Sequence, residues 1–176
     1  LNVDTSSMKV SVNNSNTNQL APWASAANTP TGTAYNHSMS VVARGYMYII
    51  GGNDGVNLTN TIQYAKINAD GTTGAWASGG TYPTNIQDGA IAYMNGYMYV
   101  MGGGTTGTVR TNAIYYTRVN ADGTLAGWTL SSTTLPAVRS GIGASSVVAP
   151  NGYIYIIGGE DNGNTYGSSW SIKPNA

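Results

Sequence analysis

The chain has 176 residues, a formal net charge of zero and only 8% charged residues. It has no basic patch that would meet phosphates and no apolar run approaching the roughly 20 residues of a membrane-spanning helix, which argues against nucleic-acid binding and membrane insertion. Cysteine is absent, which excludes a disulfide framework, thiol chemistry and cysteine-rich zinc sites.

The amino-acid composition favours turns and strands over helices. Gly, Asn, Thr and Ser are abundant, Lys and Glu are scarce, and 13 Tyr stand against no Phe. A surface made polar by amides and hydroxyls rather than by charge is common in secreted and cell-surface β-proteins. We therefore expect an extracellular or cell-surface location.

The chain repeats itself with a period of about 52 residues. The phrase NADGTTGAW at 68–76 returns as NADGTLAGW at 120–128, and Trp23, Trp76 and Trp128 follow nearly the same spacing. Pairs of glycines also recur, at Gly51 and Gly52, Gly102 and Gly103, and Gly158 and Gly159. We expect these tryptophans and glycines to have structural roles.

In chain order, residues 1–26 are expected to hold the third and fourth strands of a first repeat, at 8–13 and around Trp23. The next repeat is expected to have four strands: 37–44, a second from Tyr46 to the first glycine pair, 61–68 and a short one at Trp76. The following repeat has the same pattern, and the last ends at its third strand. The expected units are 1–26, 27–80, 81–132 and 133–176.

The second strand of each repeat is apolar on both faces, as in YMYII, YMYVM and YIYII. A strand of this kind has to be covered on both sides. No segment has a helical apolar period, so we expect sheets to cover sheets in a radial arrangement, as in a β-propeller. The glycine pairs would then leave room for a close neighbour, which we expect to be a tryptophan or tyrosine ring.

Three glycine-ended strands, the tryptophan after the third strand, and LPAVRSG at 135–141 resemble Kelch repeats. The resemblance covers the chain from about Trp23 onward and implies an all-β fold of propeller blades with four antiparallel strands. About three and a half blades are present, whereas closed propellers have typically four to eight. We therefore expect a partial propeller, completed by further blades of a longer chain or by self-association. The first two repeats lack the arginine that Arg139 supplies in the third.

The inventory of acid–base groups is poor, with one His, one Glu and six Asp. His37 is expected to fill a position that the family gives to histidine or small residues. In the NADG phrases, Asp70 and Asp122 are expected to hydrogen-bond their own turns rather than to hold calcium. The sequence therefore predicts no catalytic residue, metal or cofactor.

The loops after the second strand and before the first strand emerge on one face and differ between repeats, which indicates ligand binding there. The candidate binding residues are Tyr35, Asn36, Asn53, Asp54, Tyr82, Asn85, Arg110, Arg139, Glu160, Asp161 and Tyr166. We expect a non-catalytic surface module that binds a glycan or a protein partner. One alternative is a structural repeat unit of a surface layer, sheath or filament, and another is a Kelch-fold sugar mutarotase or epimerase.

Overall fold

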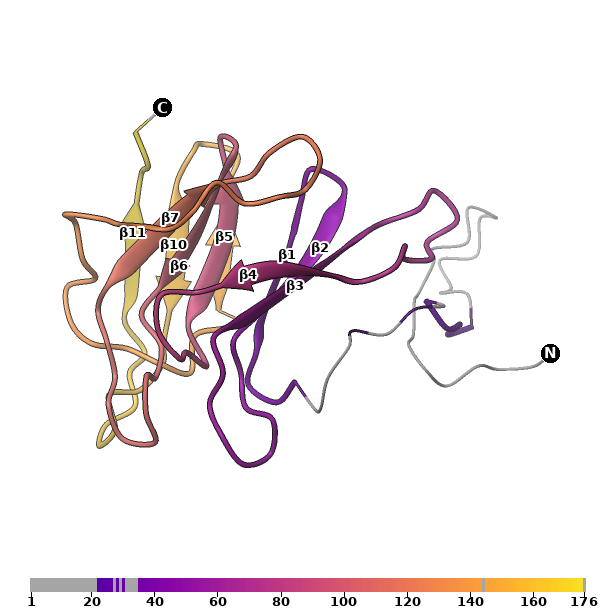
Figure 1. Ribbon diagram of the computed structural model, residues 1–176. Helices are drawn as coiled ribbons and strands as arrows, with labels where there is room; N and C mark the ends of the chain where they lie inside the picture. The colour runs from indigo at the N-terminus through magenta and orange to yellow at the C-terminus, as the bar shows by residue number, and fades with distance from the viewer. Residues whose placement is uncertain (1–21, 27, 29, 31–34, 144, 176) are drawn as a thin grey trace.

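The computed structural model describes residues 22–26, 28, 30, 35–143 and 145–175 (Figure 1). Every regular element in these residues is a β-strand, as expected. The strands are β1 Met39–Ala43, β2 Tyr46–Ile50, β3 Thr61–Lys66, β4 Ala77–Thr81, β5 Ala90–Met94, β6 Tyr97–Met101, β7 Ile114–Arg118, β8 Thr129–Leu130, β9 Ser146–Val148, β10 Ile154–Ile157 and β11 Ser169–Ile172. The expected strand at 8–13 lies outside the described residues, and around Trp23 only Ala24 makes a strand-like pairing.

The strands form three antiparallel sheets in which neighbours in the sequence are neighbours in space. The first sheet contains β1 to β4, the second β5 to β8, and the third only β9 to β11. This confirms the all-β class, the four-stranded repeats and the last repeat that ends at its third strand. The three sheets do not close into a ring.

Two-residue turns set the register of the first hairpin in the first two sheets. Arg44 and Gly45 have φ of 50° and 79°, and Asn95 and Gly96 have φ of 53° and 83°. Positive φ at both central residues defines the turn whose twist matches that of paired strands. The pairing of β1 with β2 follows directly, and alternate residues of β2 then point to opposite faces of the sheet.

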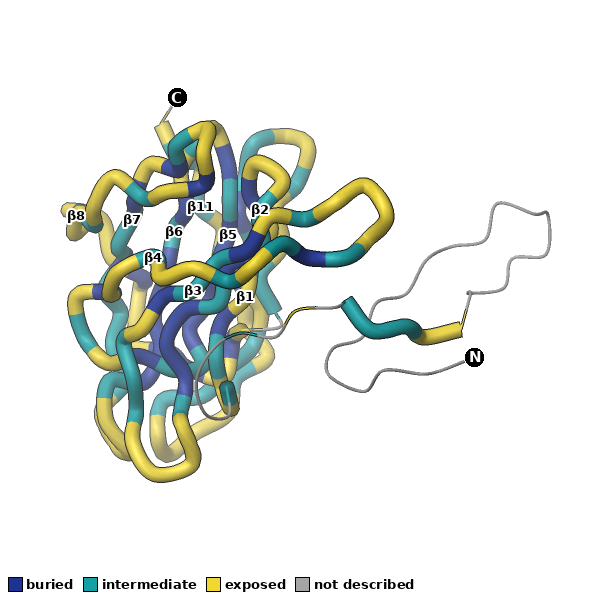
Figure 2. Tube along the Cα trace, turned by 45° about the vertical axis from the view of Figure 1, so that its right-hand side comes forward, coloured by how far each residue is buried: buried dark blue, intermediate teal, exposed yellow. Residues whose placement is uncertain are grey.

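The sheets pack face to face, with β1 next to β5 and β5 next to β9. One apolar cluster lies between the first and second sheets and another between the second and third. Met98 and Val100 of β6 belong to the first cluster, whereas Met101 of the same strand belongs to the second. The second sheet is therefore covered on both faces, and buried residues concentrate in the strands (Figure 2).

The glycine pairs bring the end of each second strand against the backbone of the next sheet. The N–H of Gly52 donates to the carbonyl of Ile86, and that of Gly103 donates to the carbonyl of Arg139, both at 2.7 Å. A Cβ on Gly102 would lie 2.6 Å from that Arg139 oxygen. The expectation that an aromatic ring fills this space is wrong, because main-chain carbonyls and aliphatic side chains occupy it.

The third glycine pair has no following sheet in the structure. Gly158 has φ of 72°, close to the 64° of Gly102, yet its nearest neighbour is the carbonyl of Tyr166 in the same loop, 3.3 Å from an ideal Cβ. The two glycines therefore share a left-handed backbone and differ in whether another sheet packs on them.

Alanine substitutions at these glycines separate backbone strain from sheet packing. Gly158→Ala should lower the free energy of unfolding by about 1–2 kcal/mol through strain alone. Gly102→Ala should lower it by about 3 kcal/mol or more, because it also collides with the next sheet. Gly107→Ala, in open space, serves as the control and should cost less than about 1 kcal/mol. Denaturant unfolding measures all three, and equal losses at Gly102 and Gly158 would contradict the packing account.

Candidate functional site

The loops that follow β2, β6 and β10 lie at the same end of the molecule, at the bottom of Figure 1. In each sheet this loop pairs with the segment that precedes the first strand. The backbone pairs are Asn36 with Asn53, Gln87 with Gly104, and Ser140 with Glu160. The backbone frame of the expected binding face is thus the same in all three sheets, while its side chains differ.

In the first sheet, the candidate residues Asn53 and Asp54 shape their own loop. The Asp54 carboxylate accepts hydrogen bonds from the N–H groups of Asn57 and Val56, at 2.7 and 2.9 Å, and these bonds hold its pKa below the usual range. The side-chain oxygen of Asn53 accepts the N–H of Gly55. Both side chains therefore use local donors rather than facing a ligand.

The candidates around the first and second sheets do not form one cluster. Tyr35 and Asn36 lie beside Asn53, and the two asparagines exchange main-chain hydrogen bonds. Tyr82 is only 2% exposed, and its ring packs edge-on against Tyr115. Its place is in the core, where burial raises the pKa of its hydroxyl. Asn85, three residues further on, is exposed.

Five candidates gather at the third sheet: Arg110, Arg139, Glu160, Asp161 and Tyr166. Within this group, Nε of Arg110 lies 2.6 Å from Oε1 of Glu160, and the hydroxyl of Ser140 donates to the same oxygen. The Ser140 hydroxyl lowers the pKa of Glu160 most, and Arg110 and the N–H of Asn162 lower it further, against the opposing effect of burial. The N–H of Asn162 donates to the other carboxylate oxygen, so both oxygens have donors within the protein.

Arg139 is 3% exposed and lies between two aromatic rings. Its guanidinium carbon is 3.6 Å from the ring centroid of Tyr166 and 4.4 Å from that of Trp170, which is cation–π geometry. The Nε and Nη1 atoms have no hydrogen-bond partner among the described residues. The Tyr166 hydroxyl donates to the carboxylate of Asp161. Arg139 thus acts as a packing element in this structure rather than as an exposed clamp for an anion.

A further contact between ionisable side chains joins the first two sheets. Nδ1 of His37 lies 3.0 Å from Oδ1 of Asp88, and both side chains are partly exposed. No group of three or more His, Cys, Asp or Glu side chains that could hold a metal occurs in the described part of the chain.

The three tryptophans of the repeat differ in burial. Trp23 is 58% exposed. Nε1 of Trp76 donates to the carbonyl of Asn28 at 3.3 Å, and Trp128 packs edge-on against Tyr82 with ring centroids 5.0 Å apart. Among these three, the ring of Trp128 is the one that packs between two sheets.

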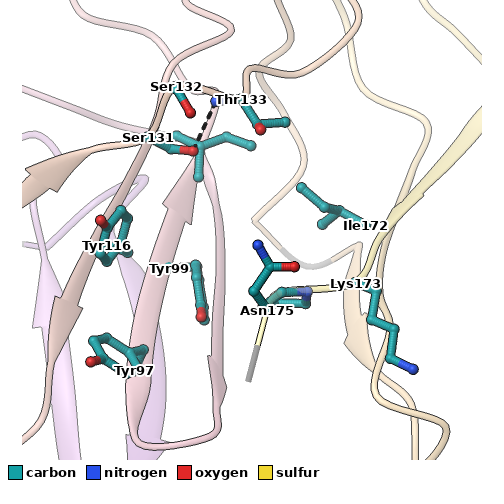
Figure 3. Close-up of a pocket in the computed structure, with 11 residues that line it drawn as sticks. Tyr97, Tyr99, Tyr116, Ser131, Ser132, Thr133, Ile172, Lys173 and Asn175 are labelled. Carbon is teal, nitrogen blue, oxygen red and sulfur yellow. Dashed lines mark hydrogen bonds between the residues drawn. The ribbon is translucent and has the colours of Figure 1, made fainter.

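A pocket of about 390 Å³ lies between β6 and β7 of the second sheet and β11 of the third (Figure 3). Three tyrosines, Tyr97, Tyr99 and Tyr116, form one wall, and Ile172 and Asn175 lie opposite. Its other lining residues are Ile114, Ser131, Ser132, Thr133, Lys173 and Pro174. Sequence reasoning missed this site, although the alternate tyrosines of the second strand were a visible signal for it.

The first sheet has the same tyrosine wall, and there it is covered. The register of the strands places Tyr46, Tyr48 and Tyr64 at the positions of Tyr97, Tyr99 and Tyr116. The second sheet's turn at 120–124 sits on this wall. The Tyr48 hydroxyl donates to the carbonyl of Gly123 at 2.6 Å, and a Cβ on Gly123 would lie 2.8 Å from the ring of Tyr46.

The tyrosine rings of the pocket wall are spaced nearly as those of the covered wall are. The ring centroids of Tyr99 and Tyr116 are 6.2 Å apart, and those of Tyr48 and Tyr64 are 5.7 Å apart. Tyr97, however, is 37% exposed. The tyrosine wall of the pocket therefore has the arrangement that, in the first sheet, binds the turn at Gly123.

Glu160→Gln tests whether the acidic cluster serves stability. The substitution should lower the free energy of unfolding by roughly 1 kcal/mol at neutral pH, the value of a charge-assisted hydrogen bond at a partly exposed site. Because the folded-state pKa lies below its ordinary 4.5, the wild-type advantage exists above about that pH and is lost as the pH falls through the lowered pKa. Denaturant unfolding across this range checks it. A difference that does not change with pH would show that packing, not charge, is responsible.

Comparison with known proteins leaves this site to be interpreted from its own geometry. No family model matches the chain, and no curated protein resembles it in sequence. Within the described residues, no helix has the length and apolar character needed to cross a bilayer.

Proposed function

We propose that the chain is a non-catalytic binding module whose tyrosine pocket holds a glycine-containing turn, supplied by a protein partner or by further residues of a longer chain. The observation that carries this proposal is the first tyrosine wall, which holds such a turn from the second sheet through the hydrogen bond from Tyr48 to Gly123. A wall of the same residue types with the same spacing is suited to the same kind of ligand.

The chemistry of the pocket defines what the turn must offer. Tyr99, at the position of Tyr48, supplies a hydroxyl donor for a main-chain carbonyl. Tyr97 stands at the position of Tyr46, whose ring a Cβ on Gly123 would approach to 2.8 Å, so the bound turn should have glycine at that point. Ser131, Thr133 and Asn175 add hydroxyl and amide groups at the rim.

The lining residues support binding rather than catalysis. They include no Asp, Glu or His, and their ionisable groups are Lys173 and the three tyrosines. The acidic cluster of the third sheet is internally paired through Arg110, Ser140 and Glu160. A mutarotase or epimerase needs a base directed at its substrate, and none of the pocket's lining residues is a carboxylate or an imidazole.

The architecture supports placing this module in a Kelch-type β-propeller. The sheets share one strand order and stack through their first strands. The same pair of opposite sheet faces meets at both interfaces. Each sheet would then be a blade of a larger ring. The low charge and the surface of amides and hydroxyls support an extracellular or cell-surface location for the whole protein.

A cyclised peptide that presents the sequence NADGT tests the proposed ligand class, because ring closure reduces the ordering cost of a turn. It should shift the NMR signals of Tyr97, Tyr99 and Tyr116. Tyr99→Phe, which removes only the hydroxyl, should weaken binding by about two- to tenfold.

The matched controls are Tyr153→Phe on the third sheet, which should bind normally, and a peptide with alanine in place of glycine, which should not bind. Equal binding of the glycine and alanine peptides would overturn the proposal. Binding of oligosaccharides, without binding of the peptide, would assign the pocket to a glycan instead.

A further inference from the structure

Charged side chains are segregated between the two ends of the sheets. The loops after the second strands form one end, the loop end, and the hairpin turns and the turns after the third strands form the opposite one, the turn end (Figure 1). Among the described residues, the loop end carries four carboxylates and two arginines, whereas the turn end carries four cations and two carboxylates. The turn-end cations are Arg44, Lys66, Arg118 and Lys173, and the carboxylates are Asp70 and Asp122.

The four turn-end cations are exposed and have no acidic partner. Both ion pairs of the described residues lie at the loop end. None of the four cations donates a side-chain hydrogen bond to a described residue, and Nζ of Lys173 lies 5.6 Å from the ring centroid of Tyr153. Their charges are therefore available to an anion from outside the described chain.

Each sheet places one of these cations beside its hairpin turn. Lys66 and Arg118 are the last residues of β3 and β7, and they pair with the first residues of β2 and β6. Lys173 follows β11, and its Cε lies 3.5 Å from an ideal Cβ on Gly152, in the turn between β9 and β10. The cations thus repeat with the sheets, and sheets that pack face to face are about 10 Å apart.

Arg44 connects the first two of these positions. Its Nη2 reaches from the first sheet to 3.5 Å from an ideal Cβ on Gly96, in the hairpin turn of the second sheet. The carbonyl of Gly96 accepts the N–H of Val119, the residue that follows Arg118. Arginines of two different sheets therefore flank one turn. The four cations lie far apart in the sequence, which contains no basic run, and the stacking of the sheets gathers them at one end.

The two carboxylates of the turn end accept hydrogen bonds from their own turns. Thr72 donates its N–H and its hydroxyl to one oxygen of Asp70, and Thr124 does the same to Asp122. The Thr124 hydroxyl, followed by its N–H, holds the pKa of Asp122 below the usual range. These charges reduce the positive potential of the turn end, but the cations outnumber them two to one.

We propose that the turn end binds an anionic polysaccharide whose chain lies across the hairpin turns of successive sheets. Cations that repeat once per sheet complement a ligand whose negative charges also repeat. Four cations spread over three sheets suit carboxylates on separate sugar units better than the phosphates of duplex DNA, which follow one another every 3.4 Å along a strand. The turns at 68–72 and 120–124 add amide and hydroxyl groups for the hydroxyls of the sugars.

This surface is distinct from the tyrosine pocket. Of the four cations, Lys173 alone lines that pocket, so Arg44, Lys66 and Arg118 can be changed without touching it. The polysaccharide proposal therefore does not depend on what occupies the pocket.

Titration calorimetry of the whole chain with polygalacturonate fragments tests the proposal. Binding should weaken steadily with added salt, because the Debye length falls from about 30 Å at 0.01 M to about 8 Å at 0.15 M ionic strength. Lys66→Gln and Arg118→Gln should each weaken binding about three- to fivefold, the usual effect of one cation at an anionic surface. Circular dichroism checks the fold of each variant.

A matched pair of variants separates a local site from an effect of net charge. Asp122→Asn at the turn end and Asp54→Asn at the loop end each remove one negative charge and keep an oxygen that can accept the hydrogen bonds of the turn. Asp122→Asn should strengthen binding about two- to fivefold, whereas Asp54→Asn should leave it unchanged. Methyl-esterified polygalacturonate, which has the same sugar without the charge, should not bind.

Three results would overturn the proposal: no binding of polygalacturonate at low salt, equal binding of the methyl ester, or equal gains from Asp122→Asn and Asp54→Asn. Tighter binding of single-stranded DNA than of polygalacturonate, with loss in Arg118→Gln, would assign the turn end to nucleic acid instead.

Discussion

The hydrogen bond from the second glycine of the first two pairs to a carbonyl of the next sheet organises the stacking of the three sheets. Gly52 and Gly103 make this bond at the same distance, to Ile86 and Arg139. Both partners are main-chain atoms, so the contact does not depend on which side chains the loops carry. Each sheet can therefore pack on the preceding sheet in the same orientation even though the loop sequences differ.

This mode of addition explains why the sheets approach most closely through β1, β5 and β9. Between the outer strands, tyrosines at alternate positions line the space, and a glycine turn fills it where the next sheet provides one. The pocket at Tyr99 and the covered wall at Tyr48 are two states of a single feature of the repeat. Binding at the pocket would thus use an interaction that the chain already makes with itself.

The loops at the expected binding face offer fewer side chains to a ligand than the differences in their sequences suggest. Asp54 and Asn53 hold their own turn, and Glu160 is engaged by Arg110 and Ser140. The carboxylates of Asp54 and Glu160 thus each have local donors that hold their loops. In the proposed function, ligand recognition therefore rests on rings, hydroxyls and main-chain groups between the sheets.

The sequence by itself determined the repeat, the four-strand units and the hairpin turns, because these depend on neighbours a few residues apart. Alternating residues define the faces of a strand, and Asn95 with Gly96 defines a turn, wherever the sheet sits. Only the tertiary structure decided that a carbonyl, not a ring, meets Gly102, and that Tyr97 and Tyr99 line a pocket. Both outcomes depend on which sheet packs next, and closely similar strands are covered or open according to a neighbour some 50 residues away.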